Sequence, residues 1–240
     1  MKALKSYILL IVFSVLNASC GQNKTDTNAT NTHETNIKKH EHPVINTSED
    51  ALNELKNGNK RFVDGKLENI DYKVQIENTK SDQRPHSIIL SCIDSRVPPE
   101  TIFDQGIGNI FVTRVAGNVE DANVLGGMEY ATKVIESKLI VVMGHNKWGA
   151  VKGAIDDAEL GNLTQLVKQI KPAITGDKSN PDKMLDETAR NNVKLTIDKI
   201  LKNSQVISGL VKEGKVKIVG AYYDISTGKV EFFNWINNSI

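Results

Sequence analysis

The stretch Cys92-Ile93-Asp94-Ser95-Arg96-Val97-Pro98-Pro99-Glu100 follows directly on the run Ser87-Ile88-Ile89-Leu90-Ser91. The earlier run is short and mostly aliphatic, which predicts a buried strand that ends at the thiol of Cys92. In an open parallel α/β sheet, ligands bind beyond the carboxyl ends of the strands. If the backbone stays extended, Cys92, Asp94 and Arg96 turn toward one side and bring a soft metal ligand, a carboxylate and a guanidinium together. A small buried hydrophobic residue beside a surface ion pair explains this stretch equally well.

A second predicted strand brings an imidazole to the same edge of the sheet. Leu139–Met143 is a continuous apolar run, and Gly144-His145 follows it. A single histidine after a strand is more often a hydrogen-bonded structural residue than a ligand. Its coincidence with Cys92 and Asp94 favours a metal ligand here.

Further short segments follow one another in a specific order along the chain. They are Asn57–Phe62, Gln83-Arg84-Pro85, Cys92–Arg96, Phe111–Asn118, Met128–Ala131, Val142–His145, Gly220–Asp224 and Thr227–Val230. Each segment is weak alone, but their order and spacing together are specific. On these residues, the chain from about Ala51 to its end resembles the β-class carbonic anhydrases.

The resemblance implies an enzyme that hydrates carbon dioxide to bicarbonate at a zinc ion, which lowers the pKa of a bound water. It implies that Cys92 and His145 are metal ligands. It also implies that Asp94 and Arg96 form a catalytic dyad. In this dyad, Asp94 either orients the metal-bound water or, in a closed form, coordinates the metal itself. Gln83 matches a residue that lines the substrate pocket across a dimer interface, so a homodimer or higher homo-oligomer is expected.

One departure from the family pattern concerns the second zinc-ligand cysteine. The family carries His-x-x-Cys, whereas this chain reads His145-Asn146-Lys147-Trp148. An indole nitrogen is a donor only, so Trp148 cannot coordinate a metal. Cys92, Asp94 and His145 could still form a three-ligand zinc site, because zinc accepts all three ligand types. We therefore expect carbonic anhydrase activity that Trp148 weakens.

Two other functions stay open at this point. In a non-catalytic exported homologue, Trp148 would fill the metal position, and Arg96 with neighbouring backbone donors would hold a small anion such as bicarbonate, or the chain would have a structural role. Alternatively, the metal site would act on a different small carbon-centred electrophile. Metal analysis of the purified domain separates the first alternative from a zinc enzyme.

The N-terminal residues predict export. Residues 1–20 carry two lysines, a short apolar stretch and small residues before Cys20, which resembles a bacterial lipoprotein signal. Residues 21–46 are polar and predict a flexible tether. We therefore expect a periplasmic or cell-envelope protein that is anchored to a membrane through lipidated Cys20, with a folded domain at residues 47–240.

Composition sets the class of protein. With 240 residues and 39% hydrophobic content, the chain can bury one ordinary core. A formal net charge of +1 gives no sign of a nucleic-acid-binding face.

Apolar periodicity predicts an α/β fold with a mostly parallel central sheet, helices on its sides and an edge strand near the C-terminus. Ser48 is the expected N-cap of the first helix, without a capping box, because Ala51 stands three residues later. The expected helices are 48–63, 122–135, 163–170, 184–201 and 206–211, and the further strands are 110–113, 216–221 and 230–233.

Overall fold

The structure is a computed structural model in which residues 45–233 are described. Its centre is a five-stranded sheet with the strand order β2-β1-β3-β4-β5. The strands are β1 (Ser87–Ser91), β2 (Ile110–Arg114), β3 (Leu139–His145), β4 (Lys217–Tyr223) and β5 (Val230–Phe233). Neighbouring strands are parallel except for β5, which runs antiparallel to β4. The predicted α/β fold with a C-terminal edge strand is therefore confirmed.

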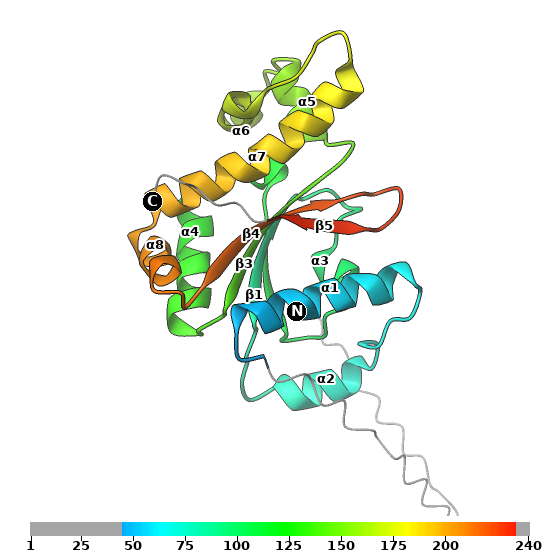
Figure 1. Ribbon diagram of the computed structural model, residues 1–240, viewed down its shortest axis with the longest axis vertical. Coiled ribbons are helices and arrows are strands. Elements are labelled where there is room, and N and C mark those ends of the chain that lie inside the picture. The colour runs from blue at the N-terminus through cyan, green and yellow to red at the C-terminus, as the bar shows by residue number, and fades with distance from the viewer. Residues whose placement is uncertain (1–44, 234–240) are drawn as a thin grey trace, which may run out of the picture. The chain divides into compact units, whose positions relative to one another are not determined.

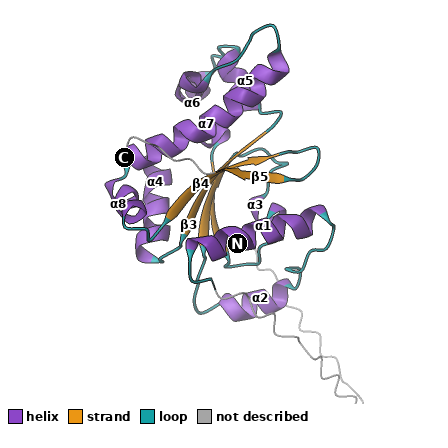
Figure 2. Cartoon of the chain, in the orientation of Figure 1, coloured by secondary structure: helices purple, strands orange, loops and turns teal. Residues whose placement is uncertain are grey.

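Helices flank the sheet on both sides (Figures 1 and 2). Those of the described part are α1 (Ser48–Val63), α2 (Tyr72–Thr79), α3 (Pro99–Ile102), α4 (Ala122–Glu129), α5 (Gly149–Ile155), α6 (Gly161–Ile170), α7 (Pro181–Asn203) and α8 (Gln205–Lys212). Short 3-10 turns are η1 (Ala116–Asn118) and η3 (Lys171–Ala173), and η2 (Tyr130–Val134) is a π-helical turn. None of the helices within residues 45–233 is long and apolar enough to cross a membrane.

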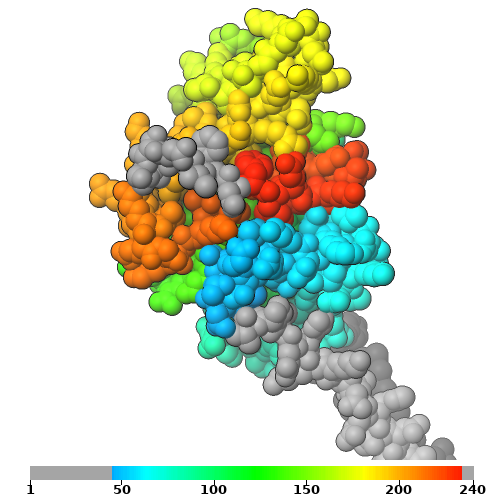
Figure 3. Space-filling model, in the orientation of Figure 1, coloured from blue at the N-terminus to red at the C-terminus, as the bar shows by residue number. Residues whose placement is uncertain are grey.

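Two apolar cores lie on opposite faces of the sheet. Ile89, Val141 and Val219 face α1 and α3, where they meet Leu55 and Phe103. The alternate strand residues form the other core with α4, α7 and α8; they are Ile88, Leu90, Ile140, Val142 and Ile218. Because β1 and β3 are buried on both faces, each carries a continuous apolar run rather than an alternating pattern. Figure 3 shows that β5 reaches the surface between α1 and α7.

The start of α1 differs from the prediction. The N-cap is Thr47 and not Ser48, and its side chain accepts a hydrogen bond from the backbone N–H of Asp50 at 3.1 Å. The Asp50 carboxylate accepts the N–H of Thr47 in return at 2.9 Å, so a capping box is present. The shift of one residue places an acidic side chain at the third helical position, where this motif needs an acceptor.

The expected helix 122–135 is interrupted. It is an α-helix to Glu129 and continues as the π-helical turn to Val134. A π-turn changes the hydrogen-bond spacing without changing the apolar pattern much, so periodicity alone does not reveal it.

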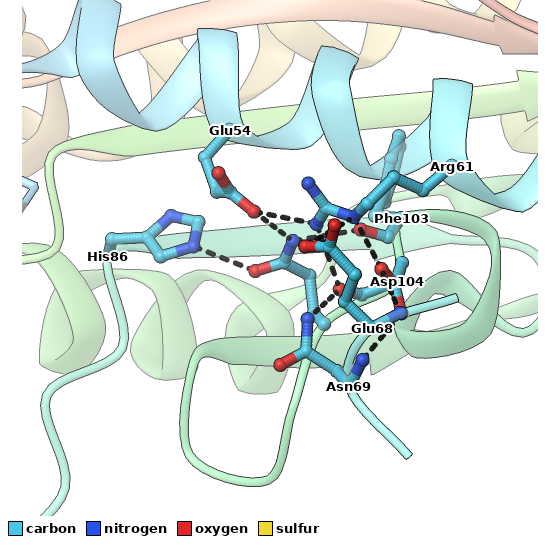
Figure 4. A network of polar contacts seen from close by, with 8 residues as sticks. Glu54, Arg61, Glu68, Asn69, His86, Phe103 and Asp104 are labelled. Carbon is cyan, nitrogen blue, oxygen red and sulfur yellow. Dashed lines mark hydrogen bonds and ion pairs between the residues drawn. The ribbon is translucent and has the colours of Figure 1, made fainter. Parts of the chain in front are cut away.

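A polar cluster joins α1 to the following loop and to the residues after α3 (Figure 4). Asp104, which is 3% exposed, accepts a hydrogen bond from Arg61 Nε at 2.5 Å. Its carboxylate also accepts the backbone N–H groups of Glu68 and Asn69 at 3.1 and 3.2 Å. The Arg61 Nη2 atom donates to Glu54 at 2.9 Å. The Asp104 carboxylate thus accepts hydrogen bonds from backbone N–H groups that lie outside helices and strands and have no partner there.

The predicted signal at residues 1–20 lies outside the described residues, as does nearly all of the tether at 21–46. Both remain predictions.

Candidate active site

Cys92 and His145 lie at the carboxyl ends of adjacent parallel strands. Leu90 of β1 pairs with Val142 of β3; Cys92 comes one residue after β1, and His145 is the last residue of β3. Both side chains are buried, with exposed fractions of 4% for Cys92 and 0% for His145. The topology therefore brings the predicted thiol and imidazole to one edge of the sheet.

Asp94 and Arg96 form the predicted pair. Arg96 Nε donates to Asp94 Oδ1 at 2.9 Å, and Arg96 Nη2 donates to Oδ2 at 2.7 Å. The backbone N–H of Arg96 adds a third hydrogen bond to Oδ1 at 2.9 Å. The hydrogen bonds from the Arg96 side chain lower the pKa of Asp94 from 3.8 to about 2, against the opposing effect of partial burial. Asp94 is therefore a carboxylate at any physiological pH.

Replacement of Arg96 by glutamine should raise the pKa of Asp94 toward that of a free aspartate, about 3.9. In the unmodified chain the pair stabilises the fold above the unfolded-state pKa, and this contribution is lost as pH falls through about 2. Carboxyl carbon chemical shifts measured against pH report the pKa directly. Arg84→Gln is the control, since Arg84 also donates to an aspartate two residues earlier, Asp82, and its loss should leave the Asp94 titration unchanged. An unchanged Asp94 titration in Arg96→Gln would exclude Arg96 as the cause.

The ring of His145 is held in one tautomer. Its Nδ1 lies 2.7 Å from the backbone oxygen of Asn146, and a carbonyl oxygen can only accept, so Nδ1 carries the proton. Nε2 then has a free lone pair, and this atom is buried without a hydrogen-bond partner. Burial lowers the pKa of His145, which keeps the ring neutral. A neutral histidine that donates its other N–H to a backbone carbonyl is the usual form of a metal ligand.

Trp148 contacts both Cys92 and His145. Its indole Nε1 donates to the Cys92 sulfur at 3.1 Å, and its ring centroid is 5.0 Å from that of His145. The side chain is 1% exposed. Gly144 leaves room for the indole, because an added Cβ at this position would lie 3.2 Å from Trp148 Cζ3. The indole therefore caps the thiol and packs beside the imidazole.

The sequence interpretation missed residues that hold this edge in place. Arg114 donates from Nε to the backbone oxygen of Cys92 at 2.9 Å and from Nη2 to that of Asp94 at 2.5 Å. Asn146 fixes the residue after His145: its Nδ2 donates to Asp224 at 2.7 Å, and its Oδ1 accepts the N–H of Ile225 at 2.9 Å. An arginine at the end of an apolar strand was the available signal for Arg114. No local pattern marks Asn146, because its partners are about 80 residues away in the chain.

Gln83 lies apart from the other predicted site residues of its own chain. It is exposed in the loop that precedes β1, at the amino end of the strand. The 5 residues of β1 span roughly 16 Å and separate Gln83 from the edge that carries Cys92. Gln83 therefore does not join the site within one chain.

Comparison with known proteins gives the family. The sequence model described as "Carbonic anhydrase" matches residues 87–230, which is more than half of the chain. Carbonic anhydrase 2 of Mycobacterium tuberculosis is 36% identical over 197 residues, covering 78% of this chain and 94% of the relative. The carbonic anhydrase of Mycolicibacterium smegmatis is 36% identical over 190 residues, covering 75% of this chain and 91% of the relative. The chain belongs to the β-carbonic anhydrase family.

Solved structures agree on the fold. One of two tetrameric β-carbonic anhydrases from Sordaria macrospora superposes with a TM-score of 0.61 at 26% identity, covering 67% of this chain and 86% of the other.

The residues at the carboxyl edge match the zinc site of this family only in part. β-Carbonic anhydrases are zinc enzymes, and the free Nε2 of His145 and the sulfur of Cys92 are suitable donors. Within residues 45–233, however, no three histidine, cysteine, aspartate or glutamate side chains lie together as a metal-binding group. Asp94 can serve as a third donor only after it leaves Arg96. Cys92 and His145 thus remain candidate ligands at this edge, and Asp94 could join them only after a rearrangement.

Proposed function

We propose that this chain catalyses the reversible hydration of carbon dioxide to bicarbonate at a zinc ion, at a rate that Trp148 reduces. The buried, free Nε2 of His145 carries the proposal, because a buried polar atom without a partner is costly unless a ligand binds it. The similarity to proteins named carbonic anhydrase at 36% identity supports the reaction.

In this proposal, Cys92 and His145 hold the metal and Asp94 is the third ligand. When bound, zinc supplies a water molecule whose pKa is lowered toward neutrality. Arg96 would hold the Asp94 carboxylate until the metal binds and release it to the metal then, and Arg114 holds the backbone of Cys92 and Asp94. Asp94 cannot both ligate the metal and accept a hydrogen bond from the water. Because changes in the surroundings of a ligand alone cost about 10 to 100-fold in affinity or activity, the loss of one thiolate should cost at least that.

A second candidate is the non-catalytic homologue. One observation favours it: Trp148 Nε1 donates a hydrogen bond to the Cys92 sulfur at 3.1 Å, so the indole occupies one side of this sulfur. In that case Arg96 and nearby backbone donors would hold a bicarbonate-sized anion, or the chain would have a structural role.

Metal analysis tests the two candidates. The purified full chain should contain stoichiometric zinc, and Asp94→Ala should weaken zinc binding by at least about 10-fold. Asp82→Ala is the control, because Asp82 also pairs with an arginine two residues later and should leave zinc binding unchanged. A chain that stays free of zinc after dialysis against excess zinc, and that shows no hydration by stopped flow, would refute the enzyme and leave the non-catalytic homologue.

Location and assembly are part of the proposal. The apolar segment and small residues before Cys20 support export and lipid anchoring. Cys20→Ser should therefore move the protein from the membrane fraction to the soluble fraction and abolish palmitate labelling, whereas Cys92→Ser should change neither. An unlabelled chain in the membrane fraction would contradict lipidation at Cys20. The tetrameric relatives in Sordaria macrospora support a homo-oligomer, in which Gln83 would serve the site of a neighbouring copy.

A further inference from the structure

One backbone carbonyl group determines which ring nitrogen of His145 is free. Nδ1 lies 2.7 Å from the carbonyl oxygen of Asn146 and donates its proton to it, so the free lone pair is on Nε2. The hydrogen bond that one imidazole nitrogen makes sets the protonation of the other. If the Asn146 carbonyl pointed elsewhere, the proton could lie on either nitrogen. The contacts that fix Asn146 therefore also fix the state of the His145 ring.

Three hydrogen bonds connect Asn146 to the end of β4 and to the turn that follows it. Its backbone N–H donates to the carbonyl oxygen of Tyr223 at 3.2 Å. Its side-chain Nδ2 donates to Asp224 Oδ1 at 2.7 Å, and its Oδ1 accepts the backbone N–H of Ile225 at 2.9 Å. A side-chain amide that donates to and accepts from the same turn cannot rotate without losing these bonds. The position of Asn146 is thus determined by the turn.

The turn at residues 224–229 is closed by hydrogen bonds of its own. The Asp224 carboxylate accepts the backbone N–H and the hydroxyl of Ser226 at 2.8 and 2.6 Å, and the hydroxyl of Thr227 at 2.9 Å. The backbone N–H of Asp224 donates to the carbonyl oxygen of Lys229 at 2.9 Å. Asp224 therefore keeps its position through contacts that do not involve Asn146.

The other side of the turn is fixed to α1 (Figure 1). Asn59, which is 7% exposed, donates from Nδ2 to the carbonyl oxygen of Gly228 and accepts the backbone N–H of Val230, both at 2.9 Å. A Cβ added at Gly228, whose φ is 74°, would lie 3.0 Å from Phe62 Cε1. The turn thus connects a buried residue of α1 to the residue beside His145.

We propose that this turn is a positioning element for His145, in which Asp224 acts through Asn146 to keep the ring proton on Nδ1 and the lone pair on Nε2. The inference rests on the proposed function, because it takes Nε2 as the metal-binding atom. It goes beyond that function, since it assigns a role to two positioning residues that are not ligands. A turn with a purely structural role would stabilise the hairpin and leave the ring unaffected.

NMR of the metal-free full chain tests the proposal. Correlations between the ring nitrogens and the carbon-bound ring protons distinguish the two tautomers, and the signals that disappear in His145→Gln belong to His145. Above neutral pH, the unmodified chain should show only the Nδ1–H form. Asn146→Leu removes both side-chain contacts at similar volume, so it should give a mixture of both forms and bind zinc about 10 to 100-fold more weakly. Asp224→Ala should change the tautomer in the same direction without altering the residue next to His145.

Asn203→Leu is the matched control, because Asn203 also donates from Nδ2 to a carboxylate, that of Glu120, at 3.1 Å. It should change neither the tautomer nor zinc binding. If folded Asn146→Leu and Asp224→Ala chains keep only the Nδ1–H form, the turn has a purely structural role and the proposal is overturned. An unmodified chain that shows both forms would also overturn it.

Circular dichroism verifies that each variant is folded, and Asn146→Ser provides the same test if leucine prevents folding. Serine is too short to make both contacts with the turn. Because the tautomer is measured without metal, the result does not depend on zinc binding. An unmodified chain that binds no zinc would refute the proposed function, whereas an unchanged tautomer in the variants would refute only the positioning role.

Discussion

Replacement of Trp148 by cysteine should increase both zinc affinity and the rate of carbon dioxide hydration by at least about 100-fold. The substitution provides a second thiolate and leaves Asp94 bound to Arg96, where it can accept a hydrogen bond instead of ligating the metal. It also removes a buried indole, and the space that this leaves can hold an ion and a water molecule. Zinc analysis and stopped-flow hydration measure the two effects.

The matched control for this variant is Trp148→Ala. It creates a similar cavity without a ligand and should gain little zinc and little activity. Large aromatic-to-alanine changes in a core cost about 3–5 kcal/mol, so thermal unfolding must be recorded for both variants. If folded Trp148→Cys protein gains neither zinc nor activity, the remaining surroundings, and not only Trp148, are incompatible with the metal site.

Replacement of Asp104 by alanine should lower the free energy of unfolding by about 3 kcal/mol or more. The change leaves Arg61, which is 18% exposed, without its shortest carboxylate contact and two backbone N–H groups without acceptors. Asp104 also has a φ of 46°, a conformation that aspartate tolerates better than alanine. Urea unfolding followed by circular dichroism measures the loss.

The control for Asp104 is Asp64→Asn at the C-cap of α1. Asp64 pairs with Lys60 at the surface, and exposed pairs of this kind contribute about 0–1 kcal/mol. A loss below about 1 kcal/mol in Asp104→Ala would contradict the central role of this carboxylate in fixing α1. Because the cluster lies on the side of α1 and not at the carboxyl edge of the sheet, the bound zinc per folded chain should not change.

The elements that the sequence predicted best are those in which burial alone determines the pattern. Ser87–Ser91 and Val230–Phe233 match their strands, and the first helix matches residue for residue. The errors occur where a side chain competes with the pattern. Thr47 is the N-cap of α1 because Asp50, three residues later, accepts its backbone N–H in return. The π-turn after Glu129 depends on packing between elements.

The sequence predicted which residues lie at the site better than it predicted the contacts between them. A thiol and an imidazole after two apolar runs were enough to expect that Cys92 and His145 meet at one edge of a parallel sheet. The bidentate pairing of Asp94 and Arg96 also follows from their spacing. The hydrogen bond between Trp148 and Cys92 does not, because it joins the residue before α5 to the residue after β1, 56 positions away in the chain. The free Nε2 of His145 likewise depends on the backbone path of Asn146.

The cap that Trp148 places on Cys92 has a consequence for chemical durability. Cys92 is the one free thiol among residues 45–233, and it is buried. A pair of neighbouring thiolates that loses its metal in an oxidising compartment can close into a disulfide, which would inactivate the site. Here the neighbour of the sulfur is an indole, which offers no second thiol for such a bridge. In the envelope location that we propose, tryptophan in place of the second thiolate would therefore protect the site from closing into a disulfide, at the expense of metal affinity.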